Sequence, residues 1–123
     1  MLKFCIKPPL IKIELGFKNN ALDTAVGLAR CAVQGGARAI VCSPLEIAAI
    51  RAAVGSSVTI ITPGVRPADS QKSDDQVRTM TPAQAMQEGA DFVVIGRPIT
   101  QSFSQGLQAM RERSIEIAEQ LRA

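Results

Sequence analysis

The chain has 123 residues, of which 46% are hydrophobic and 20% are charged, with a formal net charge of +3. This length and composition are sufficient for one modest domain with its own core. The Lys and Arg residues are scattered, and Tyr and Trp are absent, so the sequence offers neither a basic face nor stacking aromatics for nucleic acid. Dispersed, mild basicity suits acidic small molecules better.

Cysteine and histidine content excludes several kinds of site. Cys5, Cys31 and Cys42 are irregularly spaced, and the chain contains no histidine. A zinc site made from Cys and His is therefore excluded, as is any nucleophile activated by His, and we expect no metal. We expect the three thiols to be reduced, with Cys31 and Cys42 buried.

The N-terminal residues do not resemble a targeting or membrane segment. Lys7 and the pair Pro8-Pro9 interrupt the apolar residues before the core of a signal peptide is reached. No apolar run approaches the roughly 20 residues that a membrane span needs. We therefore expect a cytoplasmic protein that does not interact with membranes.

The first half of the chain becomes interpretable only after residue 20. Residues 1–20 have no clear helix or strand period, and we interpret them as a poorly defined lead to a domain at 21–123. From Ala21, apolar residues recur at helical spacing until Gly35-Gly36 ends the predicted helix. A short buried strand at 37–42 follows. Ser43-Pro44-Leu45-Glu46 then has the pattern of a capped helix start, and this helix ends at Gly55.

The second half repeats the same alternation. A strand at 58–61 leads into a long polar loop, Ala68 to Arg78. Thr81, Pro82 and Gln84 repeat the capping pattern, and a short helix extends to Gly89. A third strand at 92–95 precedes a final helix from about residue 104 to residue 121.

Short apolar strands alternating with capped helices predict an α/β fold made of parallel βα units with right-handed crossovers. The strands are apolar throughout, which is typical of strands in a sheet that helices cover or surround. Ligands in such folds bind at the carboxyl ends of the strands. Here those ends read Cys42-Ser43, Thr62-Pro63-Gly64 and Gly96-Arg97.

Two of these strand ends carry a glycine followed closely by an arginine. Gly64 precedes Arg66 by two positions, and Gly96 is adjacent to Arg97. A guanidinium binds phosphate through two parallel hydrogen bonds, and a glycine lets the backbone approach a ligand closely. The pattern therefore indicates a phosphate site. The alternative is that Gly64 serves a turn and that the arginines are solvated or paired with Asp74, Asp75 or Asp91.

For the other polar residues, the sequence gives weaker evidence of a functional role. Gln76 lies in the long loop, where its amide could donate to a phosphate oxygen or to a base, or could simply be solvated. The pair Asp74-Asp75 is better explained by a turn or the surface, because adjacent side chains do not normally converge. No base accompanies Cys42 and Ser43, and Ser43 is better explained as a helix cap.

Four linked segments resemble orotidine 5′-phosphate decarboxylase of the bacterial type, in their order as well as their spacing. The resemblance extends from about residue 21 to the C-terminus and is carried by Val41-Cys42-Ser43-Pro44-Leu45-Glu46, Ile61-Thr62-Pro63-Gly64-Val65-Arg66-Pro67, Asp74-Asp75-Gln76-Val77-Arg78 with Met80-Thr81-Pro82, and Val94-Ile95-Gly96-Arg97-Pro98-Ile99-Thr100.

The resemblance implies a (β/α)₈ TIM barrel that works as a homodimer without a cofactor. Its reaction converts orotidine 5′-monophosphate to UMP and CO₂ in pyrimidine biosynthesis. The matched part corresponds to the sixth to eighth strands, so we expect a partial barrel of about the last three to four βα units. By the resemblance, Arg66 contacts the ligand, Gln76 lies on the loop that closes over the phosphate, and Gly96 with Arg97 holds the phosphate.

The sequence differs from the family pattern at the catalytic residues. The family's alternating Lys-Asp array is marked by D-x-K-x-x-D, and no such motif occurs in this sequence. Residues 69–74 are the nearest approach and have the wrong spacing. We therefore assign no catalytic residue, and we expect the C-terminal half of a decarboxylase that is inactive alone. Phosphate contacts cannot supply the ~20 kcal/mol of the largest enzymatic accelerations.

Two alternatives remain open at this point. The chain could be a non-catalytic remnant that binds a nucleotide or phosphate, or one chain of a split enzyme whose partner supplies the first strands. A half barrel also exposes unpaired strand edges, which invite association. We therefore expect a homo-oligomer or association with a missing N-terminal half.

Overall fold

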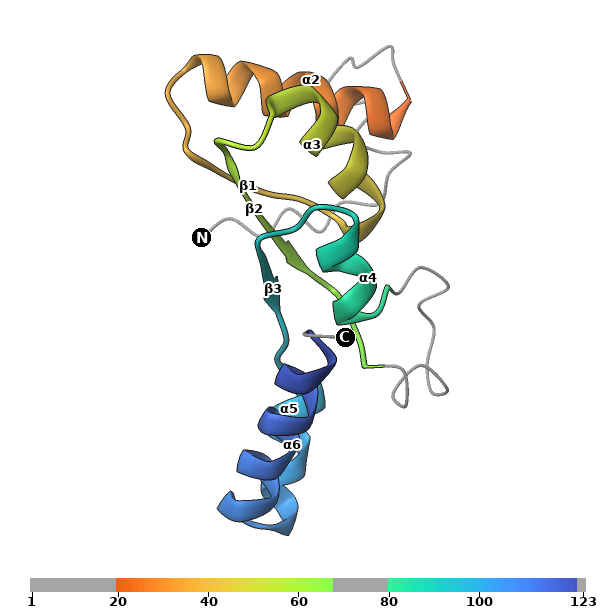
Figure 1. Cartoon of the computed structure of the whole chain (residues 1–123), viewed down its shortest axis with the longest axis vertical. Helices are drawn as coiled ribbons and strands as arrows, with labels where there is room; N and C mark the ends of the chain where they lie inside the picture. Colours follow the sequence, from red (N-terminus) through yellow and green to blue (C-terminus); the bar gives the residue numbers. More distant parts are fainter. Residues whose placement is uncertain (1–19, 68–79, 122–123) are drawn as a thin grey trace, which may run out of the picture.

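A computed structural model describes residues 20–67 and 80–121 (Figure 1). Within these residues three short strands alternate with helices, in the order α2 (Ala21–Gln34), β1 (Ala39–Val41), η1 (Pro44–Glu46), α3 (Ile47–Val54), β2 (Thr59–Pro63), α4 (Pro82–Gln87), β3 (Phe92–Val94), α5 (Arg97–Thr100), η3 (Gln101–Gln105) and α6 (Leu107–Gln120). The predicted alternation of helix and strand is confirmed, although the strand boundaries other than the start of β3 shift by one or two residues.

The helix starts follow from local side-chain caps. Thr81 and Gln84 form the reciprocal pair expected before α4: Gln84 N–H donates to Thr81 Oγ1 at 3.2 Å, and Thr81 N–H donates to Gln84 Oε1 at 3.0 Å. Before η1 and α3, Ser43 N–H donates to Glu46 Oε2 at 2.9 Å. These short-range bonds satisfy backbone donors that a helix leaves unpaired, so both starts are encoded locally.

The strands form one parallel sheet in the order β1-β2-β3. Ile61 is the partner of Val41 on one side and of Phe92 on the other, and Thr62 is the partner of Val93. Because neighbouring partners point to the same face and successive residues to opposite faces, the register sorts the side chains into two sets.

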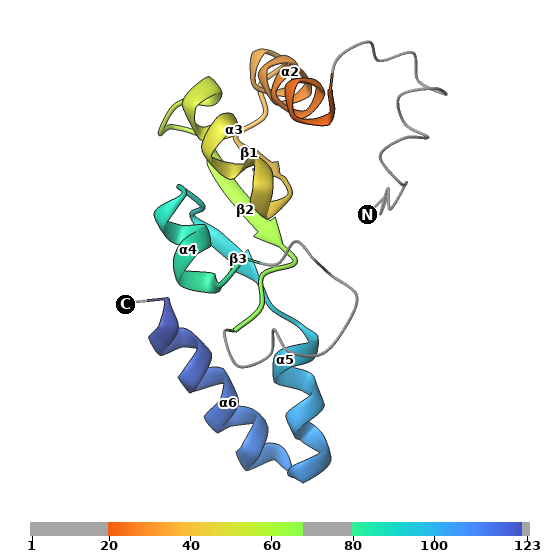
Figure 2. The same cartoon turned by 90° about the vertical axis from the view of Figure 1, so that its right-hand side faces the viewer.

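One face of this sheet carries the core. Its strand residues are Ile40, Ile60, Thr62 and Val93, and α3 and α4 pack against them through buried residues that include Ile47, Ile50 and Ala85. Helix α2 packs on α3 and contributes the buried Ala29. Figure 2 shows α3 and α4 on the same side of the strands.

The opposite face is open, which differs from the sequence prediction of buried strands. Val41, Phe92 and Val94 are 69%, 61% and 53% exposed, and all three are apolar. We call this face, which carries Ala39, Val41, Thr59, Ile61, Pro63, Phe92 and Val94, the open face. The continuous apolar strands do indicate a sheet built for burial on both faces, but the described residues cover only one of them.

The final helix predicted from about residue 104 to residue 121 corresponds to α6, which begins three residues later, whereas α5 and η3 before it were not predicted. Helix α5 and the 3₁₀ turn η3 run out from the end of β3, and α6 returns beside them, so that the pair extends away from the sheet (Figure 1). Gly106, with φ of 106°, separates η3 from α6, and this left-handed conformation favours glycine. Among the described residues, no helix is both long and apolar enough to cross a membrane.

Candidate functional site

The strand register brings the two Gly-Arg segments to the same end of the sheet, where the carboxyl ends of the strands lie. Pro63 and Val94 are partners at the carboxyl ends of the neighbouring strands β2 and β3. Arg66 follows Pro63 by three positions, and Arg97 follows Val94 by three positions. Both arginines therefore lie just beyond the carboxyl ends of the strands, which is where parallel α/β folds bind ligands.

Arg66 is fixed by its backbone as well as by the strand before it. Its N–H donates to the carbonyl oxygen of Met80 at 3.0 Å, and its side chain is half-buried. Val65 and Pro67 on either side are buried. This hydrogen bond joins the residues that precede and follow the segment 68–79. Gln76, Asp74 and Asp75 belong to that segment and lie outside the described residues.

Arg97 is the first residue of α5 and is exposed, with Gly96 as the residue before the helix. Gly96 has φ of −109° and ψ of −89°, and a Cβ there would meet no atom within 4 Å. Packing among the described residues therefore does not explain this glycine. Gly64 is different, because its φ of 81° already favours glycine. The turn explanation is thus sufficient for Gly64.

In the described part of the chain, neither Arg66 nor Arg97 forms an ion pair with a carboxylate. The ion pairs there join Arg51 to Asp91 and Arg113 to Glu116. The alternative that Asp91 pairs with Arg66 or Arg97 is therefore wrong. Asp91 directly precedes β3, at the end of the sheet opposite to the two arginines.

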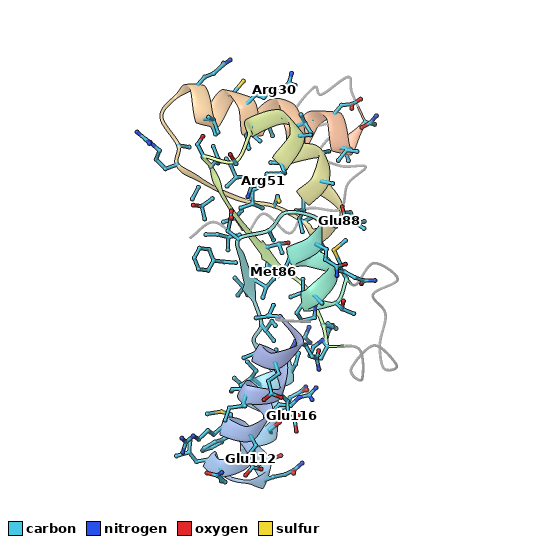
Figure 3. The ribbon with its side chains drawn as sticks, in the orientation of Figure 1. Arg30, Arg51, Met86, Glu88, Glu112 and Glu116 are labelled. Carbon is cyan, nitrogen blue, oxygen red and sulfur yellow. The ribbon has the colours of Figure 1, made fainter. Side chains whose placement is uncertain are left out.

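A cluster centred on Arg51 was not found from the sequence. The Arg51 side chain extends from α3 toward the segment that precedes β3 (Figure 3). It donates to the carbonyl oxygens of Gly55 at 2.7 Å, Val58 at 2.6 Å and Gly89 at 2.8 and 3.0 Å. Its Nη2 also lies 2.5 Å from Asp91 Oδ2. One guanidinium thus joins α3 to the loops that begin β2 and β3.

Asp91 extends this cluster into the sheet. Its Oδ2 accepts the backbone N–H of Ile60 at 2.7 Å. This bond is the largest cause that lowers the pKa of Asp91 below its ordinary value of 3.8; desolvation opposes it, and smaller contributions from Arg51 add to the lowering. Asp91 therefore stays ionised at neutral pH, and its bond to Ile60 fixes the start of β3 against β2. We interpret the cluster as structural, because it lies at the amino ends of the strands.

The carboxyl end of β1 holds a thiol unsuited to nucleophilic chemistry. Burial, with a smaller contribution from the Glu46 carboxylate, raises the pKa of Cys42 to about 11. Its carbonyl oxygen accepts the hydroxyl of the buried Thr62 at 2.9 Å, which joins β1 to β2. Cys31, expected to be buried, is instead exposed on α2, where Ala29 faces the core. No cluster of three potential metal ligands occurs among the described residues.

The fold and these positions together define an α/β protein with two arginines just beyond the carboxyl ends of neighbouring parallel strands. Comparison with known proteins identifies the family. Residues 14–112 match the model of the orotidine 5′-phosphate decarboxylase / HUMPS family, so the chain belongs to that family.

The sequence relatives are considerably longer than this chain. An orotidine 5′-phosphate decarboxylase of Opitutus terrae is 55% identical over 86 residues, which are 70% of this chain and 37% of the relative. The same enzyme of Thermobifida fusca is 52% identical over 95 residues, 77% of this chain and 40% of the relative. The chain therefore spans less than half the length of these relatives.

A solved structure gives the same result for the fold. The crystal structure of orotidine 5′-phosphate decarboxylase from Lactobacillus acidophilus matches all of this chain and 47% of its own, with a TM-score of 0.74 and 28% sequence identity. The expectation of a partial chain of this family is confirmed at that level, as is an α/β fold with parallel strands.

Proposed function

We propose that this chain is the C-terminal, phosphate-binding part of an orotidine 5′-phosphate decarboxylase, and that it binds the 5′-phosphate of orotidine 5′-monophosphate or UMP. The observation that carries the proposal is the placement of Arg66 and Arg97. They follow the carboxyl ends of two neighbouring parallel strands, and neither is ion-paired to a described residue. The names of the sequence relatives supply the nucleotide.

The proposed contacts follow from the chemistry of a phosphate dianion. Two guanidinium groups offer charge-assisted hydrogen bonds, which are stronger than neutral ones. Gly96 leaves space beside the backbone in which a phosphate oxygen can approach a main-chain N–H. Gln76 is proposed as a further amide donor, on the strength of the resemblance and not of its geometry.

We further propose that this chain alone does not decarboxylate the nucleotide. Loss of CO₂ leaves a carbanion that must be stabilised and then protonated, and the resemblance assigns that task to a Lys-Asp array. The motif of this array, D-x-K-x-x-D, does not occur in the sequence. Phosphate binding contributes remote binding energy that orients the base, but it provides no group at the reacting carbon.

Titration calorimetry with UMP tests the binding proposal. We expect saturable binding that Arg97→Ala weakens at least tenfold, in line with loss of a charge-assisted contact worth about 1.5–3 kcal/mol. Arg38→Ala is the matched control, because Arg38 is also exposed and carries the same charge but precedes β1 at the other end of the sheet. Equal weakening by both substitutions would reduce the effect to net charge and contradict the proposed site.

A decarboxylation assay tests the second proposal separately. The purified chain is incubated with orotidine 5′-monophosphate, and UMP is quantified by chromatography. We expect no UMP above a control without protein, whether or not UMP itself binds. Turnover that Arg97→Ala diminishes would refute the assignment of the chain as a non-reacting part.

A further inference from the structure

The central strand β2 ends in a proline at a position where its ladder with β1 requires a donor. Thr59 N–H donates to the carbonyl oxygen of Arg38 at 2.9 Å. Further along the ladder, Cys42 N–H donates to the carbonyl oxygen of Ile61 at 3.2 Å. Because the odd-numbered residues of β2 thus bond to β1, the register requires an N–H at position 63, opposite the carbonyl oxygen of Cys42. Position 63 is occupied by proline, which has no N–H.

The hydroxyl of Thr62 replaces this missing donor. It donates to the carbonyl oxygen of Cys42 at 2.9 Å, whereas its distance of 3.4 Å to the carbonyl oxygen of Pro63 is long for an O–H···O bond. Thr62 is 0% exposed and Cys42 is 7% exposed, so water has little access to the pair. A buried carbonyl oxygen without a donor destabilises a fold. The Thr62 side chain thus extends the β1–β2 ladder by one hydrogen bond beyond the point where proline ends it.

The surroundings of Thr62 show that packing alone does not explain a hydroxyl there. Among the described residues it is the one buried polar side chain, on a face of the sheet whose other residues, Ile40, Ile60 and Val93, are apolar. Valine has the same branched shape and would fill the same space. The following proline restricts Thr62 to extended backbone, and a β-branched side chain has few rotamers, so its hydroxyl is held in one direction.

The hydroxyl bond lies at the start of the segment that carries Arg66. The chain turns at Gly64, with φ of 81°, and Arg66 follows Pro63 by three positions. On the side of β3, the segment is held by the pairing of Pro63. At its far end, the N–H of Arg66 donates to the carbonyl oxygen of Met80 at 3.0 Å. On the side of β1, the contact just beyond the backbone ladder is the hydroxyl of Thr62.

We propose that Thr62 is a positioning residue for Arg66, whose hydroxyl fixes the carboxyl end of β2 against β1. The link to a phosphate ligand rests on the proposed function, whereas the replacement of the ladder donor does not. Hydrogen bonds from a guanidinium to phosphate weaken when the groups move by a few tenths of an ångström. Release of one side of β2 therefore weakens phosphate binding, although Thr62 acts only through the backbone and does not touch the ligand.

Two substitutions separate the hydroxyl of Thr62 from its volume. Thr62→Val keeps the branched shape and removes the donor, whereas Thr62→Ser keeps the donor and removes a buried methyl group. In titration calorimetry, we expect Thr62→Val to weaken UMP binding about two- to tenfold, the range of one net hydrogen bond, and Thr62→Ser to leave it within about twofold. We expect both variants to be less stable in urea. Equal weakening of UMP binding by serine and valine would overturn the positioning role.

Restoring the backbone donor tests the replacement directly. Pro63→Ala supplies the N–H that proline lacks, so the hydroxyl of Thr62 becomes redundant in this background. We expect Thr62→Val to lower the urea midpoint in the parent chain and to have at most about half that effect in Pro63→Ala. Equal effects in both backgrounds would overturn the replacement. If Thr62→Val alone is unfolded, the double variant is expected to fold, and a double variant that is also unfolded would overturn the proposal.

Amide hydrogen exchange, followed by NMR, reports on the position of Arg66 without a ligand. In Thr62→Val, we expect the N–H of Arg66 to exchange about two- to tenfold faster relative to the N–H of Thr59, which lies at the other end of β2. A general loss of stability would accelerate both amides equally, and that result would overturn the local role. A parent chain that does not bind UMP contradicts the proposed function, and the two amides then still decide whether Thr62 positions Arg66.

Discussion

Replacing Arg51 with Met removes a guanidinium that joins three loops while keeping a long, unbranched side chain. The wild-type side chain donates to the carbonyl oxygens of Gly55, Val58 and Gly89 and pairs with Asp91. These groups belong to the end of α3 and to the segments that lead into β2 and β3. The substitution therefore tests whether one side chain holds the amino ends of the sheet together.

The expected cost follows from the number and exposure of these bonds. Arg51 makes five hydrogen bonds, and a net hydrogen bond contributes about 0.5–1.5 kcal/mol. The Arg51 side chain is only 20% exposed, but that of Asp91 is 44% exposed, which places the ion pair at the weaker end. We expect a loss of about 3 kcal/mol, a large part of the 5–15 kcal/mol of an ordinary domain.

Urea unfolding followed by circular dichroism measures this loss. With a slope of about 2 kcal/mol per molar, the midpoint is expected to fall by about 1.5 M. Arg111→Met is the control, because Arg111 is exposed on α6, and we expect a change within about 0.5 kcal/mol. A loss below about 1 kcal/mol for Arg51→Met, or equal losses for both variants, would refute the structural role assigned to Arg51.

Two further predictions concern titrating groups. The lowered pKa of Asp91 means that its contribution is present above the ordinary value of 3.8 and is lost as the pH falls through the depressed pKa. Urea midpoints measured from pH 6 to pH 2 should therefore fall more steeply for the wild type than for Asp91→Asn, and parallel curves would contradict the assignment. In a Cys5→Ser background at pH 8, Ellman's reagent should modify the exposed Cys31 quickly and the buried Cys42 only slowly, because the pKa of Cys42 is raised to about 11. A fast phase that survives Cys31→Ser would show that Cys42 is accessible.

Much of the fold was predictable because its signals are local. The cap residues Thr81 and Gln84 lie three positions apart and bond to each other, so the start of α4 was identified without knowledge of the rest of the chain. Strand positions were likewise indicated by short apolar runs. The final helix was placed to within three residues, but α5 and η3 were missed. The break at Gly106 was missed as well, because an isolated glycine does not by itself indicate a left-handed backbone.

The open face could not be predicted from an apolar pattern alone. Val41 and Phe92 are apolar in the same way as Ile60, and only the register and the helix positions separate exposed from buried residues. The two arginines were identified because glycine and strand ends are visible in the sequence. Arg51 was missed because its partners are backbone carbonyls, which every residue carries. The role of Gln76 stays a prediction.

The pairing of β1, β2 and β3 in chain order has a consequence for how the protein folds during synthesis. The hydrogen bond that joins β1 to β2, from Thr62 to Cys42, spans 20 residues, and the bond from Ile60 to Asp91 spans 31. Each strand of this sheet thus pairs only with the strand before it or after it in the chain. Because closing such short loops costs little entropy, the β1–β2 unit with α3 can assemble before residues 80–121 are translated. The growing chain then adds β3 to an existing edge, so each new strand finds its partner already in place.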